Sequence, residues 1–109
     1  MNLRRIRSAG VLALLLLAAT PVWAQGDAAA GESKNAICQG CHGIEGFRMA
    51  YPTVYSVPML GGQGAAYIAA ALKAYRSGDR KNETMHAIAA SLSDQDIEDL
   101  AAYYSGSAD

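Results

Sequence analysis

Both cysteines of this 109-residue chain, and one of its two histidines, lie within five consecutive positions. In the stretch AICQGCHGIE, Cys38 and Cys41 are separated by two residues, and His42 follows directly. At helical spacing the two sulfurs lie about one turn apart, with the imidazole next to them. This clustering raises the question of which chemistry uses all three side chains.

The first 24 residues are expected to form a secretory signal peptide that is cleaved near Ala24. Arg4, Arg5 and Arg7 form a basic start, an apolar run follows that is short for a membrane span, and small residues precede the cleavage site. The alternative is a leader that stays uncleaved as a membrane anchor. Cleavage leaves one domain, residues 25–109, in the periplasm and without stable membrane insertion.

The composition of the expected mature chain points to a bound group. Six Lys and Arg residues face ten Asp and Glu residues, so nucleic acid is excluded as a partner. Of the 40 apolar residues after Ala24, 17 are alanine and only 21 are larger than alanine or cysteine. Small domains that lack core volume usually recruit a disulfide, a metal or a cofactor. We therefore expect a cofactor to fill the interior.

Helical periodicity predicts an all-α fold of three to five helices. Residues 64–78 carry apolar side chains at i, i+3, i+4 and i+7, and Gly78 is expected to end this helix. The same spacing recurs in residues 91–106, where Ser93 and Asp96 have the pattern of a capping box. The Ala-rich residues 27–42 predict one helix that leads into the cysteines, and residues 82–91 predict a short fourth helix.

The segment between Gly43 and Gly64 differs in composition from the rest of the chain. It is rich in Gly, Pro, Tyr and Val and has no helical period, which predicts a long ordered loop. The chain contains no run of alternating β-branched residues, so we predict no strand in this segment or elsewhere. A loop of this length in so small a domain usually wraps around something.

Two thiols at this spacing occur in several kinds of site. A thioredoxin-like redox centre needs a βαβ context, which the sequence does not predict. A structural zinc site needs four ligands, and His86 is too far from the motif to provide the usual paired spacing. A disulfide between the two cysteines would close a loop too short to stabilise much, and it leaves His42 without a role.

Covalent haem attachment is the interpretation that uses all three residues. In C-x-x-C-H each cysteine forms a thioether with a vinyl group of the haem, and the histidine becomes the proximal iron ligand. The porphyrin also supplies the missing core, and export fits because this attachment is associated with the bacterial periplasm. We predict one haem c, bound through Cys38 and Cys41, with His42 on the iron.

The second axial ligand is expected to be a methionine, because a haem that only carries electrons usually has both axial positions filled by protein. Met49 is only seven residues beyond His42, and Met59 could reach from the long loop. We predict Met85, where the chain can return across the open face before the last helix. The alternatives are Met59, an open site or another ligand. His86 is a candidate for that other ligand, but because it is next to Met85 we expect it to face solvent.

The sequence resembles the class I c-type cytochromes, specifically the small monohaem bacterial group near cytochrome c553 and the domains of cytochrome c4. The stretch GESKNAICQGCHGIEG resembles the first helix and haem-binding turn of that group. PMLGGQGAAYIAAALKAYRSGDRKNETM resembles its middle helix and methionine approach, and LSDQDIEDLAAYYSG resembles its final helix. The resemblance implies the class I cytochrome c fold around one haem, with His42 and Met85 as axial ligands and Cys38 and Cys41 as thioether sites.

The resemblance also implies a close contact between two helices. The first helix, near Gly31, is expected to pack against the last helix near Ala101 and Tyr104. A glycine at this place lets two helix backbones approach closely.

Candidate contacts to the haem propionates come from the same resemblance. Arg80 matches a position that helps to balance the propionate charge, and its alternative role is that of a solvated charge after a helix end. The only tryptophan, Trp23, lies in the expected leader, so no indole can bind a propionate. Tyr51, Tyr55 or Gln63 is expected to substitute.

The function expected from these residues is one-electron transfer by a protein that is not an enzyme. Its partners would be redox proteins, a donor and an acceptor such as a dehydrogenase or a terminal oxidase. The basic stretch Lys73, Arg76, Arg80 and Lys81 is either part of a partner surface or a solvated face. The alternatives are the cytochrome subunit of a periplasmic dehydrogenase, such as flavocytochrome c sulfide dehydrogenase, and a five-coordinate haem that binds gas or acts as a peroxidase.

Overall fold

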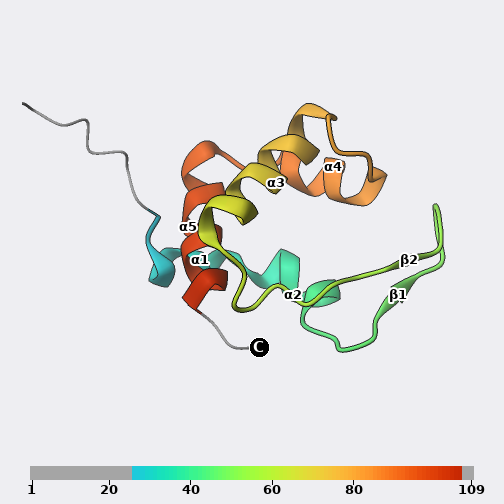
Figure 1. The fold of residues 1–109 in the computed structure, drawn as a ribbon, viewed down its shortest axis with the longest axis horizontal. Helices are drawn as coiled ribbons and strands as arrows, with labels where there is room; N and C mark the ends of the chain where they lie inside the picture. The colour runs from blue at the N-terminus through green and yellow to red at the C-terminus, as the bar shows by residue number, and fades with distance from the viewer. Residues whose placement is uncertain (1–25, 107–109) are drawn as a thin grey trace, which may run out of the picture.

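A computed structural model describes residues 26–106 of the chain. The expected signal peptide and its cleavage site lie outside the described residues. The described elements are five helices and two short strands: α1 (Ala28–Lys34), α2 (Ala36–His42), β1 (Arg48–Met49), β2 (Tyr55–Ser56), α3 (Ala65–Ser77), α4 (Glu83–Ala90) and α5 (Asp94–Gly106) (Figure 1). This confirms the helical fold class. No helix in this range is both long and apolar enough to cross a membrane.

The two most periodic segments fold as predicted. α3 ends at Ser77, and Gly78 caps it: Gly78 adopts the left-handed conformation with φ 84° and donates its N–H to the Tyr75 carbonyl at 3.2 Å. α5 begins with the expected capping box. The Asp96 N–H donates to Ser93 Oγ at 3.0 Å, and the Ser93 N–H donates to the Asp96 carboxylate at 2.9 Å.

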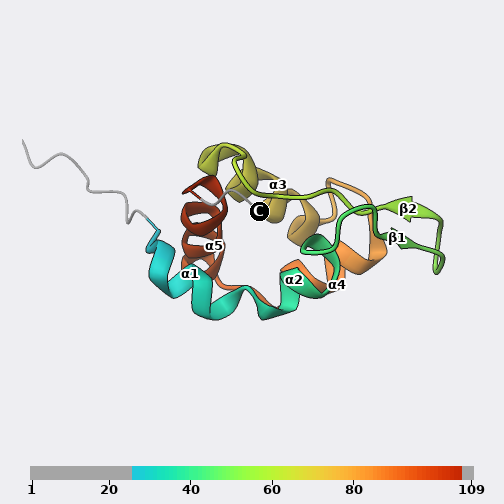
Figure 2. The same ribbon diagram turned by 90° about the horizontal axis from the view of Figure 1, so that it is seen from below.

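The segment predicted as one first helix is divided at Asn35. Asp27 caps α1 by accepting the Ala29 N–H, and α1 ends at Lys34. Asn35 is buried, and its carbonyl accepts the N–H groups of Cys38 and Gln39 at 2.8 and 2.9 Å. Asn35 is therefore the N-cap of α2, and Figure 2 shows α2 following α1 with a bend between them.

The long loop contains a structure that the sequence did not predict. β1 and β2 pair antiparallel, with Arg48 opposite Ser56 and Met49 opposite Tyr55, and form a hairpin that projects from the helices (Figure 1). The expectation of no strand is wrong in this detail, because strands of two residues are too short to show alternation. The end of the loop is fixed to the last helix, since the Gly62 N–H donates to the Tyr104 carbonyl at 2.9 Å.

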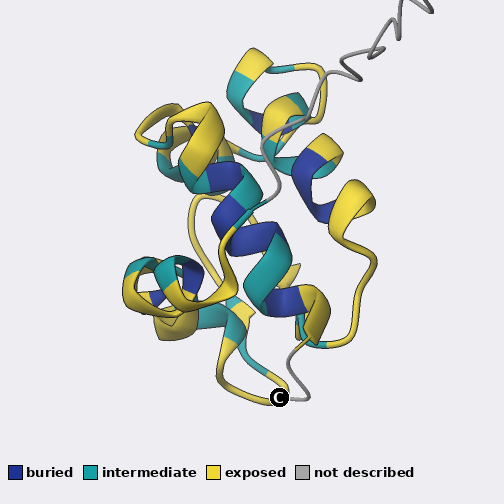
Figure 3. Ribbon diagram, turned by 90° about the vertical axis from the view of Figure 1, so that its left-hand side faces the viewer, coloured by how far each residue is buried: buried dark blue, intermediate teal, exposed yellow. Residues whose placement is uncertain are grey.

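The core lies along α5, the central helix in Figure 3. Ile97 and Leu100 are the largest fully buried side chains of the described residues, and they pack with Ile68 and Ala69 of α3. So few large side chains form a small core, as the composition predicted.

α1 crosses α5 at Gly31, as the resemblance implied, but the facing residues differ from the expected ones. A Cβ atom on Gly31 would lie 2.1 Å from the Asp99 carbonyl oxygen and 2.7 Å from Tyr103 Cβ. The expected partners, Ala101 and Tyr104, are buried in the core cluster instead. They point in other directions around α5, because Ala101 follows Asp99 by two residues and Tyr104 follows Tyr103 by one, at about 100° per residue.

A buried carboxylate joins α1 to α5. Asp99 is 3% exposed and accepts hydrogen bonds from Lys34 Nζ at 2.7 Å, the Asp27 N–H at 2.8 Å and Gln95 Nε2 at 2.8 Å. Lys34 also pairs with Asp96 at 2.9 Å. The hydrogen bonds from Lys34 and then from the backbone lower the pKa of both Asp96 and Asp99 to about 2.

Candidate functional site

A cavity of about 610 Å³ lies beside this core, enclosed by α2, the long loop, α3, α4 and α5. Its size is within the range of small-molecule and cofactor sites. Aliphatic side chains such as Ile68, Leu72 and Leu100 form much of its wall. Its lining also includes every residue predicted for the site: Cys38, Cys41, His42, Tyr51, Tyr55, Gln63, Arg80 and Met85.

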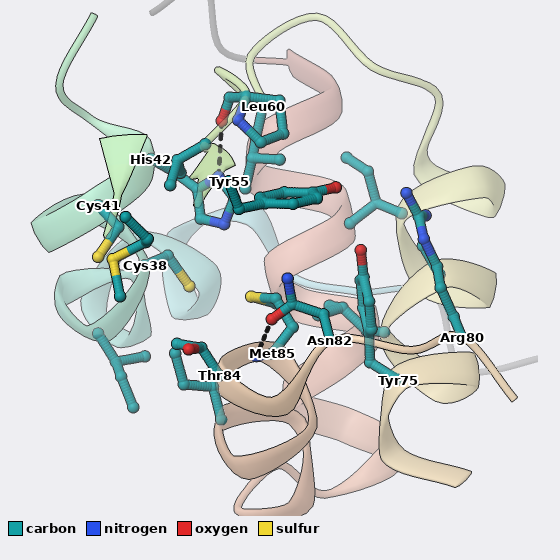
Figure 4. Close-up of a pocket in the computed structure, with 18 of the residues that line it drawn as sticks. Cys38, Cys41, His42, Tyr55, Leu60, Tyr75, Arg80, Asn82, Thr84 and Met85 are labelled. Atoms are coloured by element: carbon teal, nitrogen blue, oxygen red, sulfur yellow. Dashed lines mark hydrogen bonds between the residues drawn. The ribbon is translucent and has the colours of Figure 1, made fainter. Parts of the chain in front are cut away.

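α2 carries the motif along one wall of the cavity (Figure 4). Cys38 and Cys41 are free, half-buried thiols, and the helix places them three residues apart. Burial raises the pKa of the Cys38 thiol, and a hydrogen bond with the Tyr104 side chain opposes this. Among residues 26–106, no three His, Cys, Asp or Glu side chains lie close enough together to hold a metal ion.

The long loop fixes the imidazole of His42. His42 Nδ1 lies 2.6 Å from the carbonyl oxygen of Pro58. Because a carbonyl only accepts, Nδ1 must carry the hydrogen, and Nε2 is then the nitrogen whose lone pair can bind a metal. Sequence reasoning did not find Pro58, since any residue in the loop offers a carbonyl and no side-chain pattern marks this one.

α4 places Met85 in the same cavity. Asn82 caps the helix by accepting the Met85 N–H on Oδ1 at 2.9 Å, and this fixes the backbone of Met85 in the first turn. Figure 4 shows the sulfur of Met85 pointing into the cavity from a different element than the cysteines and His42. Met49 and Met59 also line the cavity, from β1 and from the loop after β2.

Three tyrosines that line the cavity, Tyr55, Tyr67 and Tyr75, surround Arg80. The Arg80 guanidinium lies over the Tyr75 ring, 4.7 Å from its centroid, and donates to the Tyr67 hydroxyl at 3.3 Å. Burial raises the pKa of Tyr75, and the charge of Arg80 opposes this. Tyr55 interacts with Tyr75 from the hairpin. Tyr67 and Tyr75 were missed by sequence reasoning, which assigned Tyr75 only to the apolar face of its helix.

Not every residue predicted to contact a propionate lies in the cluster of Arg80 and its tyrosines. Gln63 lines the cavity, and its side-chain oxygen accepts the Gly64 N–H at 3.0 Å, at the start of α3. Tyr51 lies beyond β1 and is 83% exposed. Of the four predicted propionate contacts, Arg80 and Tyr55 are therefore the two that lie together.

The cavity and its donor set fit a haem. The cavity is largely apolar, and its lining combines two thiols, an imidazole with a fixed hydrogen and a thioether. The sequence pattern of the cytochrome c family matches residues 28–106, nearly the whole described range.

The chain belongs to the cytochrome c family.

Membership of this family, together with the Cys38 and Cys41 pair, means that the protein carries one covalent haem c. The chain is 49% identical over 83 residues to cytochrome c-554(548) from Halomonas halodenitrificans, covering 73% of this chain and 95% of that protein. As a member of the cytochrome c family, the protein is an electron carrier.

Two further relatives are longer than this cytochrome c. The crystal structure of reduced recombinant cytochrome c4 from Pseudomonas stutzeri matches with a TM-score of 0.56 and 33% identity, over 75% of this chain and 50% of that chain. A protein named thiosulfate dehydrogenase electron acceptor, from Stutzerimonas stutzeri, is 39% identical over 62% of this chain and 31% of its own length. The match to cytochrome c4 confirms the cytochrome c fold.

Proposed function

We propose that this cytochrome c is an exported one-electron carrier whose iron is bound by His42 Nε2 and Met85 Sδ. The observation that carries the proposal is that both residues line one cavity and are fixed by hydrogen bonds that leave these donor atoms available. His42 Nδ1 is engaged by Pro58, and the Met85 N–H is engaged by Asn82. Histidine and methionine together fill both axial positions.

The bound haem supplies the ferric and ferrous states between which one electron is exchanged. The chain's own residues set the conditions for that exchange. The aliphatic walls exclude water, and the Met85 thioether favours the ferrous state and so raises the reduction potential. With both axial positions occupied, a small ligand must displace a side chain before it can bind, which favours electron transfer over gas binding or peroxidase chemistry.

Substitution of the two candidate methionines tests the ligand assignment. Met85→Ala is expected to abolish the far-red ferric absorption band of methionine-ligated haem, while Met59→Ala retains the band. Both variants remove a thioether from the cavity lining, so Met59→Ala is a matched control for lost packing. Loss of the band in Met59→Ala alone would assign the ligand to Met59 instead.

The propionate contacts are proposed to lie at the cluster of Arg80 and its tyrosines. Arg80 is the cation of this cluster, and the Tyr67 and Tyr75 side chains hold its guanidinium in place. Tyr55 adds a further hydroxyl from the hairpin. The roles proposed for Tyr51 and Gln63 are secondary, because Tyr51 is largely exposed and the Gln63 oxygen is already engaged.

Export to the periplasm is the proposed location. It is supported by the leader pattern of residues 1–24 and by the covalent haem, whose attachment is associated with that compartment. N-terminal sequencing of the protein from the periplasmic fraction should begin at Gln25. A protein that keeps residues 1–24 and sediments with membranes would support the anchored alternative.

A dehydrogenase is the proposed electron donor, on the basis of the relative named thiosulfate dehydrogenase electron acceptor. Rapid-mixing reduction of the ferric protein by a thiosulfate dehydrogenase would test this donor, and reduction no faster than by thiosulfate alone would exclude it.

The basic stretch of Lys73, Arg76, Arg80 and Lys81 contributes less to a partner surface than its sequence suggests. Lys73 pairs with Glu98 at 2.9 Å, and Arg76 pairs with Asp94 at 2.6 Å, both across to α5.

A further inference from the structure

The side chain of His86 turns away from the cavity that its neighbour Met85 lines. His86 lies in the first turn of α4 and is not part of the cavity lining. Its Nδ1 atom lies 2.8 Å from the carbonyl oxygen of Tyr75, in the last turn of α3. Because the carbonyl only accepts, Nδ1 is the donor. His86 therefore joins two helices and is directed away from the iron site.

The Tyr75 carbonyl belongs to the end of α3, where backbone carbonyls lack helical partners. It accepts the Gly78 N–H within its own turn at 3.2 Å and has a second lone pair for the imidazole of His86. The same residue lines the cavity with its ring, under Arg80. The bond from His86 thus connects the segment that carries Met85 to a fixed part of the cavity wall.

Met85 is consequently held on both sides along the chain. Before it, Asn82 accepts its N–H at 2.9 Å, and the Arg80 N–H donates to the Ala74 carbonyl at 3.1 Å. After it, His86 bonds to α3. The Asn82 contact fixes the start of α4, and the Arg80 contact fixes the connection between α3 and α4. Of these contacts, only the His86 hydrogen bond joins a side chain within α4 to another helix.

We infer that His86 is a positioning residue, which keeps the Met85 sulfur at the iron by fastening the first turn of α4 to the last turn of α3. The inference rests on the proposed role of Met85 as ligand. Without the imidazole, this turn of α4 can move away from α3 while the rest of the fold stays intact. The consequence is a faster departure of methionine from the iron, at nearly unchanged overall stability.

The test compares three variants of the haem-loaded ferric protein with wild type. The rate at which saturating imidazole removes the far-red band reports how fast the methionine leaves. His86→Ala removes the hydrogen-bond donor. It also changes the helix propensity of this position, because alanine favours helix more than histidine does. His86→Asn places an amide nitrogen near the position of Nδ1 and has a similar helix propensity. Lys34→Ala lowers overall stability through the α1 to α5 contact, far from α4.

The expected result is displacement about five-fold faster in His86→Ala, the ratio for one lost hydrogen bond. His86→Asn and Lys34→Ala should stay within about two-fold of wild type. An unchanged rate in His86→Ala would overturn the inference, and so would an equal acceleration in Lys34→Ala, since the effect would then reflect overall stability. If Met85→Ala retains the far-red band, the ligand assignment itself fails and the inference falls with it, by a separate readout.

Discussion

A single hydrogen bond determines which nitrogen of His42 can bind the iron. The motif C-x-x-C-H identifies the histidine from sequence, but the acceptor, the Pro58 carbonyl, is a backbone atom 16 positions away. Met85 is similar: the sequence predicts its sulfur as a ligand, while the Asn82 cap that fixes its backbone appears only in the structure. Sequence indicates the atoms that do chemistry, and the backbone contacts that orient them require the fold.

Arg80 provides a prediction at the scale of one residue. Arg80→Gln should lower the reduction potential, because loss of a positive charge near the haem stabilises the ferric state. The expected size is on the order of tens of millivolts, as for one unit charge at an effective dielectric constant near 20 or above. Potentiometric titration of the haem-loaded protein measures it.

Arg76→Gln is the matched control, since Arg76 pairs with Asp94 and does not line the cavity. Its potential should stay close to that of wild type. Equal potentials for Arg80→Gln and wild type would remove Arg80 from the propionate site.

At the scale of elements, the strongly periodic segments were predictable and the irregular ones were not. α3 and α5 follow their apolar spacing and their end signals, Gly78 and the Ser93 and Asp96 capping box. No proline or glycine marks the break at Asn35, and the burial of Asn35 is visible only in the fold. The hairpin depends on two residue pairs across a loop, a signal too short for periodicity to detect.

The crossing of α1 and α5 should tolerate no side chain at Gly31. Gly31→Ala places a Cβ 2.1 Å from the Asp99 carbonyl oxygen, so the helices must separate. The free energy of unfolding should fall by about 3 kcal/mol, in the range for overpacked contacts. Denaturant titration of the haem-loaded protein measures the change.

Gly106→Ala adds the same methyl group at the end of α5, where no atom lies within 4 Å, and should change stability by less than about 1 kcal/mol. If both variants unfold at the wild-type midpoint, the close contact between α1 and α5 is not formed in solution.

For the whole molecule, the haem is expected to be a large part of the core. The described residues bury few large side chains, and the cavity of about 610 Å³ beside them is open to solvent when no haem fills it. A small domain has a stability of only about 5–15 kcal/mol, so loss of the contacts with the haem removes a large fraction of it. The Cys38→Ser, Cys41→Ser double variant, prepared without haem, should therefore show no cooperative thermal unfolding by circular dichroism. A sharp transition like that of the haem-loaded protein would contradict this.

Acid should weaken the whole fold through the carboxylates that bind Lys34. The pKa values of Asp96 and Asp99 are about 2 in the folded protein and about 3.8 when unfolded. Because the folded values are lower, their contribution is complete above pH 4 and is lost as the pH falls from about 4 to 2. Thermal unfolding of the haem-loaded protein should show a steep loss of stability in that window.

Lys34→Ala should reduce the stability difference between pH 5 and pH 2.5, because the partner that lowers both pKa values is gone. Lys81→Ala, an exposed lysine between α3 and α4, should keep the wild-type pH dependence. The same pH dependence in Lys34→Ala as in wild type would show that other groups control acid stability.

This cytochrome c is proposed to transfer electrons with both axial positions of the haem iron filled by its own side chains. The most direct test is the visible spectrum of the haem-loaded protein in the ferric state and, after reduction, with and without carbon monoxide. A far-red ferric band and a ferrous spectrum that carbon monoxide does not change are the predicted results. A high-spin ferric spectrum, with rapid binding of carbon monoxide to the ferrous protein, would contradict the claim and indicate a ligand-binding haem.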